Sequence, residues 1–141
     1  MQVSLINQPN EKRKLQEALQ EFARDHRLSK KVLQAADLSL EEHLTNVMNY
    51  GFDDARVHEI LVRLEIADGE LQIEIEDDGR SFNPLKAPEP DLHLPLSERP
   101  VGGLGIHLIR KFMDGLGYRR EGNRNVFRMC KRLEPSPAGF N

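Results

Sequence analysis

Two neighbouring runs of alternating apolar residues constrain the fold of this chain most strongly. Apolar side chains occupy every second position from Ile60 to Ile66, and again from Leu71 to Ile75. Such alternation is typical of β-strands with one buried face, and the Ala-Asp-Gly sequence at residues 67–69 suits a tight hairpin turn between them. The chain is therefore expected to contain an antiparallel hairpin whose apolar face must be covered by other elements.

Three further segments are expected to form helices. Residues 11–26 carry apolar side chains at the i, i+4, i+7 and i+8 spacing of a helix, and a second helix is expected from an N-cap at Ser29 to about residue 50. A third is expected from about residue 104 to about 115. Short strands are expected at residues 3–6, 116–120 and 126–133. The predicted fold class is α+β: a two-layer α/β sandwich (helices on one face of a mixed, mainly antiparallel sheet).

The length of 141 residues suits one domain with its own core, which we expect to span residues 1–133. Periodicity disappears across residues 80–102, a stretch that holds five of the eight prolines. A loop of this length inside a compact domain is commonly a lid, a binding loop or a disordered segment, and the prediction here is a lid over about residues 80–102. Residues 134–141 are expected to be a flexible tail.

The composition argues against several classes of function. A formal net charge of −3 gives no support for direct binding of nucleic acid or of a membrane surface, since both usually require a basic patch. No apolar run approaches the roughly 20 residues that cross a bilayer, and the N-terminus lacks the apolar core of a signal peptide. Cys130 is the single cysteine and cannot form an internal disulfide, so a cytoplasmic location is expected.

A carboxylate and an amide lie one turn apart in the second expected helix. Glu42 and Asn46 stand at i and i+4, and Asn49 and Tyr50 fall on the same face. An asparagine oxygen is a neutral ligand suited to Mg²⁺ that also bridges phosphates, and a carboxylate one turn away could orient or deprotonate an attacking hydroxyl. The alternative is an ordinary solvated polar face.

Asp77 ends the second apolar strand on its core side. Strand residues alternate between faces, so Asp77 points the same way as Leu71 and Ile75. A carboxylate at the edge of an apolar core needs a partner, and an adenine amino group would provide one, while Gly79 would let backbone approach the base. The alternative is that Asp77 only caps a turn of the Asp-Asp-Gly type.

A glycine cluster formed by Gly102, Gly103 and Gly105 precedes and opens the third expected helix. Free N–H groups and the positive end of the helix dipole make such a start a phosphate site, and the alternative is a hinge for the proline-rich loop. The segment lacks the lysine of a P-loop and the third glycine of a Rossmann fingerprint, and the motifs of eukaryotic protein kinases are absent from the sequence. A nucleotide site here would belong to none of these common types.

In this order and at this spacing, the three segments resemble the motifs of the Bergerat-fold (GHKL) ATPases, in particular the small bacterial anti-sigma-factor serine/threonine kinases. The resemblance covers about residues 6–133, with Ser81 where many members have a second glycine and Tyr50 where histidine is frequent. The matches to the N box, the first glycine box and the second glycine box are, in order, Glu42-x-x-x-Asn46-x-x-x-Tyr50, Asp77-x-Gly79-x-Ser81-Phe82-Asn83-Pro84 and Gly103-Leu104-Gly105-Ile106.

The resemblance implies a role for each matching residue. Glu42 would be the catalytic general base and Asn46 would hold Mg²⁺. Asp77 would read the adenine amino group, with Gly79 beside it. Arg99, in the expected lid, is a candidate contact to the γ-phosphate, with a solvated loop charge as the alternative. The other residues expected to contact ATP are Asn49, Phe82, Gly102, Gly103, Leu104, Gly105 and Ile106.

The resemblance also implies an anti-sigma regulatory factor with ATP and Mg²⁺ as cofactors. Such a protein would phosphorylate a serine or threonine of an anti-sigma-factor antagonist and would sequester a sigma factor or a similar regulator. The resemblance also suggests a homodimer. Two alternatives stay open: a non-catalytic module switched by ATP and ADP, and a stand-alone histidine-kinase catalytic domain. The presence of Glu42 favours catalysis, because pure binding needs no base.

Overall fold

The computed structural model describes residues 1–86 and 103–133, and its elements follow the expected order. The strands are β1 (Gln2–Ile6), β2 (Glu59–Ala67), β3 (Glu70–Asp77), β4 (Gly115–Glu121) and β5 (Arg124–Arg132). The helices are α1 (Lys12–Asp25), α2 (Lys30–Tyr50) and α3 (Gly103–Phe112), with short 3-10 turns at Pro9–Glu11 and Pro84–Lys86. The expected tail and most of the expected lid lie outside the described residues.

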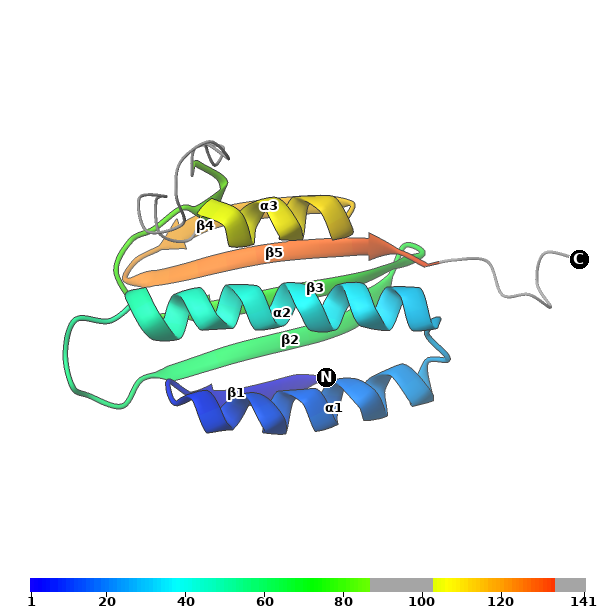
Figure 1. Ribbon diagram of the computed structural model, residues 1–141, viewed down its shortest axis with the longest axis horizontal. Helices are drawn as coiled ribbons and strands as arrows, with labels where there is room; N and C mark the ends of the chain where they lie inside the picture. The colour runs from blue at the N-terminus through cyan, green and yellow to red at the C-terminus, as the bar shows by residue number, and fades with distance from the viewer. Residues whose placement is uncertain (87–102, 134–141) are drawn as a thin grey trace, which may run out of the picture.

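The five strands form one sheet in the order β1-β2-β3-β5-β4, and the three helices lie over one of its faces (Figure 1). The predicted α+β class and two-layer arrangement are therefore confirmed. Every strand pairing in the described residues is antiparallel, so the predicted mixed sheet has no parallel pair there. The reason is that β4 runs in the same direction as β3 but is not its neighbour, because β5 lies between them and is antiparallel to both.

The β2–β3 hairpin determines which side chain ends β3 on the covered face. Asp68 and Gly69 both have positive φ, 54° and 74°, which is the conformation of a two-residue hairpin turn that matches the twist of the strands. The register that follows from this turn places the fully buried Ile60 opposite Asp77. Asp77 therefore lies on the face that the helices cover, as its alternation with the apolar residues predicted.

The helices begin and pack as the sequence predicted. The Ser29 hydroxyl accepts a hydrogen bond of 3.1 Å from the backbone N–H of Val32 and so caps the start of α2. α2 lies between α1 and α3 in Figure 1. Because it continues without a break to Tyr50, Glu42 and Asn46 are one helical turn apart. The side chains that α1 buries are the four expected ones, Leu15, Leu19, Phe22 and Ala23.

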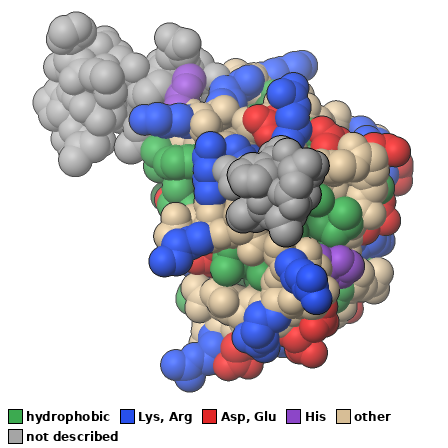
Figure 2. Space-filling view, turned by 90° about the vertical axis from the view of Figure 1, so that its right-hand side faces the viewer, with side chains coloured by type: hydrophobic (Ala, Val, Ile, Leu, Met, Phe, Trp, Pro, Cys, Tyr) green, Lys and Arg blue, Asp and Glu red, His purple; other side chains and the backbone are tan. Residues whose placement is uncertain are grey.

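The other face of the sheet carries charged side chains. Arg63 Nη1 lies 2.9 Å from Glu74 Oε1, and Arg124 Nε lies 2.8 Å from Glu76 Oε2. In the end view of Figure 2, basic and acidic side chains are interspersed and hydrophobic ones occur in small groups. Of the helices within residues 1–86 and 103–133, none combines the length and the apolar character that a bilayer span requires. The apolar core lies between the helices and the sheet.

Candidate active site

A cavity of about 420 Å³ opens at the end of the molecule where α2 and β3 both end. Its walls come from α2, from the segment that follows β3, and from β4 and β5. Its polar lining includes Asn46, Asp77 and Asn125, and its apolar lining includes Val47 and Phe127. Two of the three segments singled out in the sequence, the Asn46 helix face and the Asp77 strand end, therefore meet at one cavity.

Asp77 is 3% exposed and accepts two hydrogen bonds through the same oxygen. Its Oδ1 accepts from the backbone N–H of Gly79 at 2.8 Å and from Asn125 Nδ2 at 3.0 Å. Burial raises the pKa of Asp77, and the two hydrogen bonds oppose that rise. The described residues donate no hydrogen bond to Oδ2, so this oxygen keeps its capacity to accept one from a molecule in the cavity.

Gly79 is required by a close contact with the end of α2. A Cβ atom at this position would lie 2.6 Å from the carbonyl oxygen of Gly51, which is too close for any side chain. The same carbonyl accepts a 2.8 Å hydrogen bond from the backbone N–H of Arg80, whose guanidinium donates to the carbonyl oxygen of Tyr50. The need for glycine here therefore comes from the docking of the β3 turn on α2, in addition to any approach to a base.

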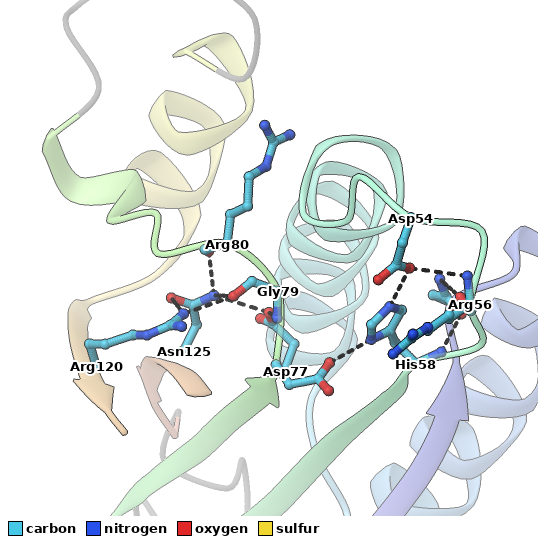
Figure 3. Close-up of polar contacts among 10 residues, drawn as sticks. Asp54, Arg56, His58, Asp77, Gly79, Arg80, Arg120 and Asn125 are labelled. Carbon is cyan, nitrogen blue, oxygen red and sulfur yellow. Dashed lines mark hydrogen bonds and ion pairs between the residues drawn. The ribbon is translucent and has the colours of Figure 1, made fainter. Parts of the chain in front are cut away.

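Asn125 is the central residue of the polar network and was missed in the sequence (Figure 3). Its Oδ1 accepts from the Tyr118 hydroxyl at 2.6 Å and from Arg120 Nη1 at 3.0 Å, so its amide nitrogen must face the other way. That nitrogen donates to Asp77 and, at 2.8 Å, to the carbonyl oxygen of Arg80. Asn125 falls between the expected strands at 116–120 and 126–133, but its alternation with the apolar Phe127 is a signal in the sequence that it lies on the covered face.

The second glycine box lies against the N box. A Cβ at Gly105 would lie 3.1 Å from Glu42 Oε2 and 3.2 Å from Asn46 Nδ2, so the first turn of α3 contacts both side chains. α3 begins at Gly103, and the first backbone N–H groups of a helix have no partner within the helix. A partly exposed carboxylate, a partly exposed amide and the positive end of a helix thus lie together.

The remaining predicted contacts fall in three different environments. Phe82 is 53% exposed and lines the cavity, as does Tyr50 of the matched N box, which was not predicted as an ATP contact and is 49% exposed. Asn49 is exposed and is not part of the cavity lining. Ile106 is 1% exposed and packs in the apolar core, where it anchors α3 and does not line the cavity.

Some predicted site residues cannot be compared with the structure. Arg99 and Gly102 lie outside the described residues. Gly103 and Leu104 are described only as the first helical residues of α3. The predicted roles of these four residues stay predictions, as do the chemical roles of the other site residues.

His43 is a second cavity residue that we did not single out in the sequence. Its side chain is 6% exposed and stacks on Phe127, with ring centroids 4.3 Å apart and an interplanar angle of 21°. Burial lowers the pKa of His43 to about 4, so the ring is neutral near pH 7. Its Nε2 has no hydrogen-bond partner among the described residues. The His43 and Phe127 rings form part of an apolar wall beside Asp77.

The two ends of the site suit different parts of one ligand. The Asp77 end combines a hydrogen-bond acceptor with aromatic and aliphatic walls, which suits a flat ring that carries an amino group. The Asn46 end combines a neutral oxygen ligand with a helix start, which suits phosphates. No group of three or more histidine, cysteine or acidic side chains in the described ranges converges to hold a metal ion. Asn46 offers a neutral oxygen at this end, and Mg²⁺ accepts such a ligand together with waters and substrate phosphates.

Comparison with known sequences assigns the chain to a family. The model of the histidine kinase-like ATPase domain matches residues 6–131. The chain is 27% identical over 117 residues to the serine/threonine-protein kinase BtrW of Bordetella bronchiseptica, and the match covers 83% of this chain and 82% of that protein. It is 30% identical over 96 residues to an anti-sigma F factor of Clostridium botulinum, which covers 67% of each.

A solved structure supports the fold independently. The chain resembles the structure of the RsbU and RsbW domains of Rv1364c from Mycobacterium tuberculosis with a TM-score of 0.67, at 12% identity. The match covers 94% of this chain and 31% of that longer chain, and at this identity it supports the fold alone. The chain therefore belongs to the histidine kinase-like ATPase family, in the group that contains anti-sigma factors and serine/threonine-protein kinases.

Proposed function

We propose that this protein binds ATP with Mg²⁺ in the cavity and transfers the γ-phosphoryl group to a serine or threonine of an anti-sigma-factor antagonist. The observation that carries the proposal is the contact of Gly105 with both Glu42 and Asn46. This contact brings a candidate base, a candidate cation ligand and a helix start together beside a cavity that suits a purine. Two relatives whose names identify them as a serine/threonine-protein kinase and an anti-sigma factor support the same function.

The adenine ring is assigned to the Asp77 end. The free Oδ2 of Asp77 accepts a hydrogen bond from the amino group of the base, while Asn125 and Gly79 hold Oδ1. Val47 and Phe127 supply apolar contact to the ring. Burial of this carboxylate makes the recognition selective, because a base with a carbonyl oxygen at this position would place two acceptors against each other.

The phosphates are assigned to the start of α3. Its free N–H groups and its dipole favour the phosphate charge, and the Asn46 oxygen is the protein ligand proposed for Mg²⁺. A bound Mg²⁺ would neutralise part of the charge on the transferred group. Glu42 accepts the proton of the attacking hydroxyl while a new P–O bond forms and ADP leaves. The substrate oxygen must reach Glu42 at hydrogen-bond distance from the side opposite the leaving group.

The partners follow from the relatives. We assign an anti-sigma-factor antagonist as the phosphoryl acceptor and a sigma factor, or an equivalent regulator, as the sequestered protein. Both act inside the cell, so we place the function in the cytoplasm. A homodimer is part of the proposal and can be measured by analytical ultracentrifugation.

The test of this proposal is a phosphotransfer assay with the Glu42→Gln variant. This change removes the base but keeps the shape of the side chain, so we expect transfer from radiolabelled ATP to an antagonist to fall by about a hundredfold or more while ADP binding stays intact. Glu41→Gln is the matched control, because Glu41 is the adjacent acid and instead pairs with Lys12 at 3.0 Å.

Three outcomes are distinct. Equal transfer by wild type and Glu42→Gln would remove Glu42 from the mechanism. Nucleotide binding without transfer to any antagonist by the wild type would indicate a binding module switched by ATP and ADP. Acid-labile phosphorylation of a partner would indicate a histidine kinase.

A further inference from the structure

His58 lies between two carboxylates next to the proposed adenine site (Figure 3). Its Nδ1 is 2.9 Å from Asp78 Oδ1, and its Nε2 is 2.7 Å from Asp54 Oδ1. A neutral imidazole has only one N–H, so only the protonated ring can donate to both carboxylates at once. The bridge from Asp54 to Asp78 is therefore complete only while His58 carries its proton.

Both the backbone and the ring of His58 are held in place. The backbone N–H of His58 donates to Asn7 Oδ1 at 2.8 Å, and the backbone N–H of Asn7 donates to the His58 carbonyl oxygen at 3.0 Å. The ring of Phe52 stacks on it, with centroids 4.2 Å apart and an interplanar angle of 13°. The charged residues around it are Asp54 and Arg56 on the same loop and Asp78 after β3, and the uncharged Asn7 directly follows β1.

The loop that carries His58 holds the turn after β3 at two points. Asp78 directly follows Asp77, so the contact of His58 with Asp78 fixes the chain next to the base-reading carboxylate. At the other end of the loop, the carbonyl oxygen of Gly51 accepts a hydrogen bond from the backbone N–H of Arg80. Asn125 holds the same turn from the β5 side. His58 itself does not line the cavity.

We propose that His58 is a positioning residue for nucleotide binding. By bridging Asp54 and Asp78, it holds the turn after β3 in the geometry in which Asp77 accepts the amino group of the base. This inference rests on the proposed function, because it requires the base to bind at Asp77. It adds a proton-dependent step to that function, since the bridge depends on the charge of one imidazole.

The direction of the pH dependence follows from the two carboxylates. The hydrogen bond with Asp54 is the largest influence on His58, and together with Asp78 it raises the pKa of the ring against the opposing effect of burial. A histidine with a raised pKa loses its favourable contacts as the pH rises through that pKa. Nucleotide affinity is therefore highest on the acidic side of the His58 pKa and falls as the pH rises through it.

The test is an isothermal titration of the full chain with ADP from mildly acidic to alkaline pH. We expect wild-type affinity to fall by about threefold to tenfold across this range. His58→Gln binds ADP weakly at every pH, because glutamine carries no proton to lose. His26→Gln is the matched control: His26 lies at the exposed end of α1 and contacts Phe22, so this variant keeps the wild-type profile.

Asp54→Asn is a second variant that leaves the core untouched, because Asp54 is exposed. It removes the largest cause of the raised His58 pKa, so the fall in ADP affinity moves to lower pH. A wild-type profile in Asp54→Asn, at unchanged thermal stability, would contradict the proposed bridge.

Inosine diphosphate separates positioning from a general structural effect. It carries a carbonyl oxygen where ADP carries the amino group, so it gains nothing from a well-placed Asp77. We expect His58→Gln to cost affinity for ADP but little affinity for inosine diphosphate. Equal loss for both nucleotides, or wild-type binding by His58→Gln, would overturn the inference alone. Absence of ADP binding by the wild type would overturn the proposed function together with it.

Discussion

At the scale of single residues, polar side chains that are buried beside the cavity mark the site. Asp77, Asn125 and His43 are at most 7% exposed. Burial of a polar group costs free energy unless hydrogen bonds replace its contacts with water. Asn125 donates a hydrogen bond that replaces water at one oxygen of Asp77, while Nε2 of His43 lacks a partner among the described residues. The fold therefore tolerates the buried imidazole of His43, and the free-energy cost of burying it can be measured.

His43 should make the protein sensitive to acid. Its pKa is lowered from 6.5 to about 4, so the unfolded chain takes up a proton at a higher pH than the folded protein does. The free energy of unfolding therefore falls as the pH falls through this range, by roughly 3 kcal/mol in all. His43→Phe keeps a ring that can stack on Phe127 and should remove this part of the loss. Urea unfolding at a series of pH values measures it.

The control for this prediction is His26→Gln, because His26 lies at the exposed end of α1. Carboxylates that titrate in the same range affect all three proteins alike, so the difference between the curves isolates His43. Parallel curves for His43→Phe and wild type would show that folding does not lower the pKa of His43.

At the scale of helices and strands, contacts between these elements bring the functional groups together. The first turn of α3 lies on the face of α2 that carries Glu42 and Asn46, and Gly105 permits this approach. The turn after β3 docks on the end of α2 through Gly79 and Gly51. In both places a missing side chain lets two elements approach closely.

Gly105→Ala should therefore impair nucleotide binding more than folding. Its Cβ would lie 3.1 Å from Glu42 Oε2 and 3.2 Å from Asn46 Nδ2, so these flexible side chains must move away from their positions. We expect ADP affinity to fall by about tenfold. Gly117→Ala is the matched control, because its Cβ would make an ordinary contact of 3.9 Å with Arg128. Equal effects of both changes on ADP affinity, or none, would contradict this account.

Local patterns explain which elements could be predicted. The alternation in β2 and β3 and the Asp68-Gly69 turn are properties of adjacent residues, so the hairpin and the buried face of Asp77 could both be predicted. The place of β5 between β3 and β4 could not, because it depends on pairing between residues far apart, such as Asp77 with Asn125. For the same reason the partners of Asp77 and the contacts of His58 emerged only from the structure.

The whole molecule is a sheet covered on one face, with its site where helix and strand ends meet. β3 and β5 place Asp77 beside Asn125, α2 places Asn46 at the cavity, and α3 starts next to Glu42. One end of this site suits a base and the other suits phosphates. The family assignment and the geometry therefore lead independently to the same kind of ligand.

Recognition of adenine by Asp77 is the claim on which the rest of the account depends. Isothermal titration of wild type and Asp77→Asn with ADP and with inosine diphosphate tests it most directly. We predict that wild type prefers ADP by about tenfold or more, and that Asp77→Asn loses most of this preference because its amide can donate to the carbonyl oxygen of inosine. Equal affinity of the wild type for both nucleotides, or an unchanged preference in Asp77→Asn, would contradict the account.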